Sequence, residues 1–406
     1  MTNDVVRDFV NEHTYDIRVT GNGRWIDQKC TMDVVCFVAD CIVDYIQNSG
    51  TQPFQSPDIW RSSYAVQSVQ DFFGKPDPMN YSAHDEFNKF FRQPMKMLAA
   101  AGVLREDGKK NNTIQFSVAS MEILEYIALR EKNAYNFMCA YVEKTLRDSG
   151  LWGSFERFFD AQDKHEYQNL KDRFAEFSIR YTKINTNREA FRIFTKVLNI
   201  LACKYRKKGT ERGHLSRSFI TFDKIMYNQV NWRDELSGKD KNIARRDYDP
   251  DAVAPAAAVY YKYRVERAKK KLHQFNDKYN RSRSEVMDTL AIGSPATHMH
   301  HIFPQNAFSE LADYLENLIA LTAGQHLQTA HPNGNTQIID RSFQYLCLVC
   351  KTGSIKENIL GNSGAPVIYS FESFAHVLSV GLSDPAFEQF EENDFESILN
   401  LIELKY

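Results

Sequence analysis

Five of the eleven histidines fall within one short stretch of the chain, between His298 and His331. Two of them, His300 and His301, are adjacent and are followed directly by Ile302-Phe303-Pro304. A neutral imidazole can take a proton from water at cellular pH, because its unperturbed pKa is about 6.5. Imidazoles are also among the commonest ligands of divalent metal ions. The stretch therefore predicts hydrolytic chemistry that combines a metal ion with a histidine base.

The residues around these histidines predict a strand, a turn, a second strand and a helix. The first strand ends at the histidine pair, and the second lies in the apolar segment LENLIAL, which contains Asn317. Thr322 begins the helix, with Gln325 three residues later as its partner in a capping box, and His326 lies in the first turn. Adjacent residues of a strand point to opposite faces. The strand must therefore end or twist at the histidine pair if both serve one site.

Three features of this segment together resemble the HNH, or ββα-metal, nuclease superfamily. They are the sequence HHIFP, Asn317 sixteen residues after the second histidine, and His326 nine residues further on. The commonest form of the family has Asp-His where this chain has His-His, and many members clamp the element with zinc through CxxC pairs that this segment lacks. The resemblance implies a ββα domain that is stabilised here by packing alone and that binds one divalent metal ion.

The resemblance also implies a role for each of these residues. His301 would activate water as the general base. His300 and His326 would bind one divalent cation, with Mg²⁺ expected and Mn²⁺ or another divalent ion as alternatives. The cation would stabilise charge on the phosphate and on the departing 3′ oxygen, and the product would carry a 5′ phosphate. Asn317 would bind backbone across the loop and orient His301, although an amide near this position contacts the metal in some relatives.

Two further histidines, His298 and His331, flank the expected ligands. On a regular helix the five residues from His326 to His331 correspond to about 140° around the axis, a poor match for one ion. Pro332 can end the helix and bend His331 inward, so both alternatives, ligand and bystander, stay open. We expect His298 to be an exposed strand residue. The alternative for the whole cluster is an inert structural zinc site. It is disfavoured because the cluster contains no cysteine and because an adjacent His-His pair leaves one of the two histidines unused as a ligand.

The first part of the chain predicts a winged-helix-like module over about residues 58–118. Helices are expected over residues 59–73 and 84–101, and Gly102 ends the second. A hairpin follows, with Gly108 in its turn. In such a module the second helix can enter a major groove while the hairpin touches phosphate, and a protein-packing role is the alternative. The candidate DNA contacts are Arg92, Lys96, Lys109 and Lys110.

More loosely, the whole chain resembles Type II restriction endonucleases of the HNH group. That resemblance rests on the block TGNGRWIDQK, the winged-helix-like module and the carboxy-terminal histidine segment. The block is Gly-rich and polar, and its Arg24-Trp25 pair is expected to be exposed. It is either a DNA-contacting loop or a connector, and we favour the connector.

Basic residues gather in the middle of the chain, although the net charge is only −2. Residues 262–283 hold nine Lys or Arg against two acids, whereas residues 301–406 hold four against thirteen. A basic helix just before the hydrolytic motif would lie along a phosphate backbone, and a solvated helix face is the alternative. The candidate contacts in the two basic stretches are Arg206, Lys207, Lys208, Lys269, Lys270 and Lys271.

Length and composition predict a folded protein with more than one domain. The 406 residues, 43% hydrophobic and 25% charged, exceed the size of one ordinary domain. We expect an α+β fold that is mostly α. It would comprise a DNA-recognition region over residues 1–130, a helical middle region over 131–250 and the nuclease domain over 251–406.

Cysteine content and hydropathy predict where the protein works. The start of the chain lacks the apolar core of a signal peptide, and no apolar run is long enough to cross a membrane. Seven cysteines, an odd number, indicate reduced thiols and, with the resemblance, a bacterial cytoplasm. Cys347 and Cys350 form a CxxC, which we interpret as two buried thiols rather than as a metal or redox site.

These features together predict a metal-dependent enzyme of the restriction type that cleaves double-stranded DNA at specific sites, as a monomer or a homodimer. One alternative is another nuclease with this motif, of the nicking, homing or modification-dependent kind. The other is a winged-helix DNA-binding regulator whose histidines are only structural.

Overall fold

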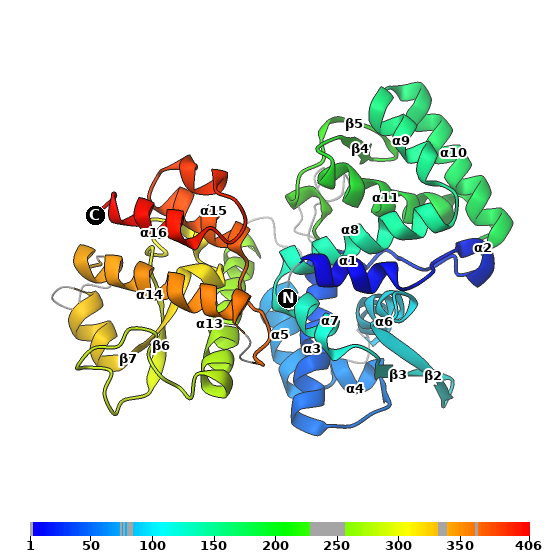
Figure 1. The fold of residues 1–406 in the computed structure, drawn as a ribbon. Coiled ribbons are helices and arrows are strands. Elements are labelled where there is room, and N and C mark those ends of the chain that lie inside the picture. Colours follow the sequence, from blue (N-terminus) through cyan, green and yellow to red (C-terminus); the bar gives the residue numbers. More distant parts are fainter. Residues whose placement is uncertain are drawn as a thin grey trace, which may run out of the picture. The chain divides into compact units, whose positions relative to one another are not determined.

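The computed structural model describes residues 3–73, 75, 78, 84–227, 256–331, 339–361 and 364–406. Within them the fold is α+β and mostly helical, with three small antiparallel sheets. The chain divides into two compact units, residues 3–256 and 257–406, which Figure 1 draws in blue to green and in yellow-green to red. None of the helices in the described ranges is long and apolar enough to cross a membrane.

The larger unit is built from helices and two small sheets. Its helices are α1 (Asn3–Asn11), α2 (Ile17–Thr20), α3 (Met32–Ser49), α4 (Ser56–Trp60), α5 (Ser63–Phe73), α6 (His84–Ala100), α7 (Met121–Leu129), α8 (Glu131–Asp148), α9 (Trp152–Ala161), α10 (Lys164–Tyr181) and α11 (Asn187–Lys204), with a short 3-10 turn at Asp223–Ile225. Its strands are β1 (Phe54–Gln55), β2 (Leu104–Lys110), β3 (Thr113–Val118), β4 (Lys208–Glu211) and β5 (His214–Phe219). One sheet has the order β1-β3-β2, and β4 pairs with β5.

Helix α3 lies at the centre of the larger unit. Its sequence MDVVCFVADCIV is apolar on nearly every side, which is typical of a helix surrounded by others. Every residue from Met32 to Val43 is buried, and α4, α6, α7 and α8 pack against the helix. It ends at Gly50, whose positive φ of 63° allows the left-handed cap.

The hairpin formed by β2 and β3 has its turn at a different place from the predicted one. Asn111 and Asn112 form the turn, and both have a positive φ. Asparagine tolerates this left-handed conformation, which a two-residue hairpin turn requires. Gly108 has a φ of 103° and lies at a register irregularity between Glu106 and Lys109. The prediction of Gly108 in the turn was therefore wrong, because the glycine serves a bulge instead.

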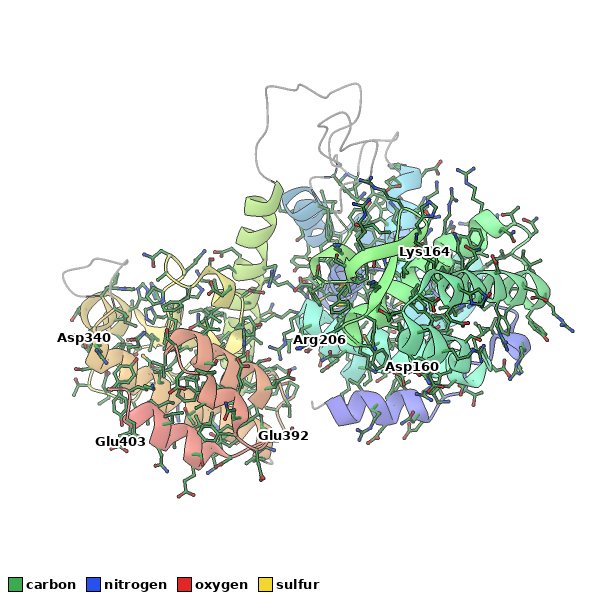
Figure 2. All side chains as sticks on the ribbon, turned by 90° about the horizontal axis from the view of Figure 1, so that it is seen from above. Asp160, Lys164, Arg206, Asp340, Glu392 and Glu403 are labelled. Atoms are coloured by element: carbon green, nitrogen blue, oxygen red, sulfur yellow. The ribbon has the colours of Figure 1, made fainter. Side chains whose placement is uncertain are left out.

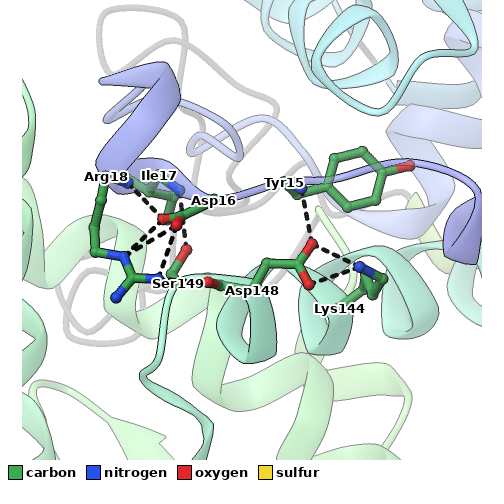
Figure 3. A network of polar contacts seen from close by, with 7 residues as sticks. All are labelled: Tyr15, Asp16, Ile17, Arg18, Lys144, Asp148 and Ser149. Atoms are coloured by element: carbon green, nitrogen blue, oxygen red, sulfur yellow. Dashed lines mark hydrogen bonds and ion pairs between the residues drawn. The ribbon is translucent and has the colours of Figure 1, made fainter.

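The amino-terminal segment is bound to the end of α8, and this joins the first two predicted regions into one unit. The backbone N–H of Tyr15 donates to the Asp148 carboxylate at 2.8 Å, and that of Ile17 donates to Ser149 Oγ at 3.0 Å (Figure 3). The predicted boundary at residue 130 lies between α7 and α8, which both pack on α3. The helical middle region therefore continues the fold of the first region.

The Gly-rich block TGNGRWIDQK packs into the larger unit. Trp25 is buried, not exposed as expected, and its carbonyl accepts a hydrogen bond from the Tyr141 hydroxyl at 3.1 Å. Arg24 pairs with Asp27 and with Glu189, each at 3.0 Å. Its charge is thus paired within the unit, which fits a connector.

The smaller unit surrounds a two-stranded sheet with helices. Its helices are α13 (Ala256–Tyr279), α14 (Arg341–Leu360), α15 (Phe371–Gly381) and α16 (Phe395–Glu403), with 3-10 turns at Ser309–Leu311, Leu315–Asn317 and Pro385–Gln389. The strands β6 (Ala296–His301) and β7 (Leu318–Thr322) run antiparallel, and a π-helical turn, η6 (Gln325–Ala330), follows β7. The predicted start of this domain, residue 251, lies outside the described residues.

A buried ion pair holds β7 within the smaller unit. Every residue of β7 is buried, and the N–H of Ala320 donates to Glu285 Oε1 at 2.9 Å. Lys351, fully buried on α14, lies 3.2 Å from Glu285 Oε2 and donates to the Tyr369 hydroxyl at 2.7 Å. Glu285, Lys351 and Tyr369 are therefore partners of one another, which offsets the cost of burying the two charges.

Candidate metal centre and general base

The pairing of β6 with β7 sets the directions of the histidine pair. His300 lies opposite Ile319 and His301 opposite Leu318, and β6 ends at His301. Successive strand residues point to opposite faces, and accordingly His300 is buried while His301 is half-buried. The two imidazoles therefore lie in different surroundings although they are adjacent in sequence.

The capping box predicted at Thr322 is present, and it fixes the turn that follows β7. The N–H of Thr322 donates to Gln325 Oε1 at 3.0 Å, and the N–H of Gln325 donates to Thr322 Oγ1 at 3.2 Å. Gln325 is fully buried, donates to the carbonyl of Val286 at 2.7 Å and accepts from Ser284 Oγ at 2.7 Å. The chain then continues as the π-helical turn η6 and not as the regular helix that we expected.

The π-helical turn brings His331 to the same side as His326. Its hydrogen bonds join residues five apart instead of four, so residues i and i+5 lie nearer to one side of the axis than on a regular helix, and His331 follows the turn in an extended conformation. The ring centroids of His326 and His331 are 4.9 Å apart. The offset of about 140° predicted for a regular helix is therefore absent. Pro332, which we expected to bend His331 inward, lies outside the described residues.

His300, His326 and His331 form a cluster in which one candidate ligand atom from each lies within 4.8 Å of the others. The ring planes meet pairwise at 77°, 71° and 83°. His300 Nε2 and His326 Nδ1 are buried and have no hydrogen-bond partner among the described residues. Buried polar atoms normally have a partner, and three imidazole nitrogens are a ligand set for a divalent transition metal. The residues therefore fit a metal ion.

Burial keeps two members of the cluster, His300 and His326, neutral at pH 7. It lowers the pKa of His300 well below the ordinary value, and the neighbouring His326 and His331 lower it further. Burial also lowers the pKa of His326 to about 4, with contributions from His331, His298 and Lys269. The neutral imidazole is the form that binds a metal ion.

His301 is held by a backbone carbonyl. Its Nε2 lies 2.9 Å from the carbonyl oxygen of Ala312. Because a carbonyl only accepts hydrogen bonds, Nε2 carries the proton and Nδ1 keeps its lone pair. Burial lowers the pKa of His301 to about 4, the Ala312 carbonyl acts in the opposite direction, and Lys269 lowers it further. At pH 7 the ring is neutral, with Nδ1 as the proton acceptor.

Asn317 binds backbone on both sides of the loop between β6 and β7. Its Oδ1 accepts from the N–H of Phe303 at 2.8 Å, and its Nδ2 donates to the carbonyls of Phe303 and Leu311, both at 3.1 Å. Leu311 directly precedes Ala312, whose carbonyl binds His301. Asn317 is completely buried. Its amide therefore fixes the loop that carries the Ala312 carbonyl.

An ion pair that we did not predict ties the same loop to α13. Arg264 Nε donates to Asp313 Oδ2 at 2.8 Å, and Arg264 Nη2 contacts the same oxygen. Asp313 directly follows Ala312, so the pair braces the carbonyl to which His301 is bound. The two residues are 49 positions apart, and no motif or spacing in the sequence connects them.

The predicted DNA contacts of the smaller unit lie on α13. Lys270 is exposed, and Lys269 and Lys271 are half-exposed. Lys269 lies close enough to the histidines to lower the pKa of His301 and His326. Lys269 is therefore a cation close to the histidine site.

The predicted contacts at the hairpin and on α6 lie on the surface of the larger unit. Lys109, Lys110 and Arg92 are exposed and Lys96 is half-exposed. Lys89, which we did not single out, is exposed on the same face of α6, because Arg92 follows it by three residues and Lys96 follows Arg92 by four. None of these five side chains has an ion pair or hydrogen bond with another described residue.

Arg206, Lys207 and Lys208 lie where α11 leads into β4. Arg206, labelled in Figure 2, is exposed and has a φ of 52°, and the two lysines are half-exposed. All three side chains are at least partly exposed on the larger unit.

The CxxC cysteines lie on α14. Cys347 is buried and Cys350 is half-buried, and both are free thiols. Burial raises the pKa of both thiols. Neither belongs to a group of three or more potential metal ligands in the described part of the chain.

No protein-family model matches the chain, and no curated protein or solved structure gives a significant match.

Proposed function

We propose that the protein is a metal-dependent DNA endonuclease of the HNH, or ββα-metal, type. The observation that carries the proposal is the cluster of His300, His326 and His331 together with a fourth imidazole, His301, whose protonation is set by the carbonyl of Ala312. The order of elements supports it as well, because the histidine pair ends one strand, and the partner strand leads into the turn that carries the third histidine.

The donor set supports a transition metal as the cofactor. Three imidazoles and no carboxylate make up the cluster among the described residues. Imidazole suits Zn²⁺, Co²⁺ or Ni²⁺, whereas Mg²⁺ prefers oxygen ligands. We therefore propose a divalent transition metal in place of the Mg²⁺ expected from the sequence. When bound, the ion supplies electrostatic stabilisation of the charge that develops on the phosphate.

His301 is the general base in this proposal. Its Nδ1 takes a proton from the attacking water, while Nε2 keeps its hydrogen bond to the carbonyl of Ala312. A phosphate beside the ring favours the charged form and raises the pKa of His301 towards the range suited to a base. Lys269 attracts the same phosphate, and Asn317 keeps the ring in orientation through the loop.

We further propose that residues 32–118, which add α3 and β1 to the module expected over residues 58–118, bind double-stranded DNA as a winged-helix-like module. The order α3-β1-α4-α5-α6-β2-β3 and the sheet order β1-β3-β2 support this. The side chains of Lys89, Arg92 and Lys96 on α6 would face the major groove, and the hairpin lysines would contact phosphate. Recognition by such a module supports cleavage at specific sites, as in a restriction enzyme.

The test is cleavage of DNA by the full chain after removal of bound metal with a chelator. Unmethylated bacteriophage DNA is incubated with Mg²⁺, Mn²⁺, Co²⁺ or Zn²⁺ in turn. We expect discrete fragments with at least one of the transition metals. His301→Ala should bind that metal as the wild type does and cleave about 10²–10⁴-fold more slowly, which is the usual contribution of a positioned base.

The control is His376→Ala, because His376 is a half-exposed histidine of the same unit that binds Glu388 at 2.9 Å. Its cleavage rate should match that of the wild type. A smear or nicked product would replace the restriction-type assignment by a less specific nuclease with the same motif. DNA that stays intact with every metal would contradict the nuclease proposal and favour a structural metal site.

A further inference from the structure

His298 occupies a special position relative to the histidine cluster. It lies two residues before His300 on β6, and strand residues two apart point to the same face. Its ring is stacked on the ring of His326, with centroids 4.8 Å apart and planes at 26°. The expectation that His298 is a simple exposed strand residue was therefore wrong, since the ring is half-buried against a member of the cluster.

The stacking geometry distinguishes His298 from the three clustered histidines. Their ring planes cross at 71° or more, so the rings approach one another edge to face. His298 instead lies nearly parallel to His326 and covers a face of its ring. Its nitrogens are not among the atoms that converge within 4.8 Å. This is the arrangement of a neighbour that supports a ligand, not that of a fourth ligand.

The ring of His298 is itself held in place. Its Nδ1 lies 3.0 Å from Thr297 Oγ1, next to the register irregularity of β6 between Ala296 and His298. His326, in contrast, is half-buried, and its Nδ1 has no hydrogen-bond partner among the described residues. No hydrogen bond at that atom fixes the rotation of the His326 ring. His300 and His331 meet the ring at steep angles, and His298, which covers a face of it, adds a parallel contact that restrains its rotation.

We propose that His298 is a positioning residue, which holds the His326 ring by stacking in the orientation needed to bind the metal ion. The inference rests on the metal site of the proposed function and adds a residue to it. Metal ligands are commonly oriented by groups that do not touch the ion, and their loss weakens metal affinity. In most such sites a hydrogen-bond acceptor orients the ligand. Here the face of the His298 ring would orient His326.

The test is a Co²⁺ titration of the full chain, followed by the visible absorption of the ion, with His298→Ala, His298→Asn and His298→Phe. Alanine and asparagine remove the aromatic face, and we expect them to weaken Co²⁺ binding by about 2- to 10-fold, the effect of one aromatic pair. Phenylalanine keeps the face without a nitrogen, so its affinity should stay within about twofold of the wild type. Circular dichroism and the thermal midpoint of the metal-free protein show that each variant is folded.

Three results would overturn the inference, and they differ from one another. If His298→Phe loses as much affinity as His298→Ala, and its Co²⁺ spectrum changes, the nitrogen of His298 binds the ion. If all three variants bind Co²⁺ like the wild type, the stacked ring has no part in metal binding. If the wild type binds no Co²⁺, Zn²⁺ or Ni²⁺, the metal site of the proposed function fails, and the inference fails with it.

Discussion

His326 and His331 are five residues apart in the sequence and 4.9 Å apart between ring centroids, because the chain between them forms a π-helical turn. On a regular helix the same two side chains would lie on different faces. Single π-helical turns are rare in proteins, but those that occur are often found at functional sites. The turn thus makes a three-histidine cluster out of what would otherwise be a pair.

The contribution of His331 can be measured directly. We expect His331→Ala and His326→Ala each to weaken the binding of Zn²⁺ or Co²⁺ by about 100-fold or more, because losing even a hydrogen-bonded group that orients a ligand costs about 10- to 100-fold. Competition with a chromophoric chelator measures the affinity. His376→Ala, on α15, should leave the affinity unchanged. Wild-type affinity in His331→Ala would reduce the site to two histidines.

Asn317 should affect both stability and catalysis. Asn317→Ala removes three hydrogen bonds from buried backbone groups, and we expect a loss of about 2–4 kcal/mol in the free energy of unfolding. The substitution also loosens the loop that carries the Ala312 carbonyl, which binds His301. We therefore expect the cleavage rate to fall at least tenfold, measured at saturating metal and at a temperature where the variant is folded.

Asn358→Ala is the matched control for this variant. Asn358 also binds three backbone groups, those of Pro366, Ile368 and Tyr369, but it lies on α14. Denaturant unfolding should give a similar loss of stability, with the rate of cleavage by the folded protein unchanged. If the two variants lose rate equally, Asn317 has no special connection to His301.

Gly381 allows the segment after the histidine pair to pack. A Cβ at Gly381 would lie 2.4 to 2.5 Å from three ring atoms of Phe303, which is fully enclosed. We expect Gly381→Ala to lower the free energy of unfolding by about 1–3 kcal/mol, as overpacking does. Gly353→Ala, inside α14 with nothing within 4 Å of the added Cβ, should raise it by about 0.5–1 kcal/mol. Thermal unfolding of both variants checks the opposite signs.

The hairpin lysines should contribute to DNA affinity through phosphate contacts. Lys109→Ala with Lys110→Ala should weaken binding on any sequence and reduce the salt dependence of the affinity by about two phosphate contacts. Replacing Lys164 and Lys183, which are exposed elsewhere on the larger unit, gives a control of equal charge. Fluorescence anisotropy at several salt concentrations measures both slopes. If the salt dependence of the hairpin variant equals that of the wild type, the hairpin of β2 and β3 does not contact the DNA phosphates.

Local signals in the sequence predicted two features well. The helix before Gly102 and the capping box at Thr322 are both present. These features depend on interactions within a few residues, so the chain encodes them locally. The hairpin turn was misplaced, because Gly108 and Asn111-Asn112 are both good turn signals and only the pairing of β2 with β3 selects between them.

The residue types of the candidate site were likewise evident from the sequence, since five histidines lie between His298 and His331. The spatial relations among these residues were not evident from the sequence. The carbonyl of Ala312, the brace between Arg264 and Asp313 and the stack of His298 on His326 join residues that no spacing rule connects. The π-helical turn also departs from the period that sequence patterns assume. Local propensity therefore determined which side chains could do the chemistry, and only the packing of β6, β7 and η6 decided which of them converge, because direction in space depends on long-range contacts.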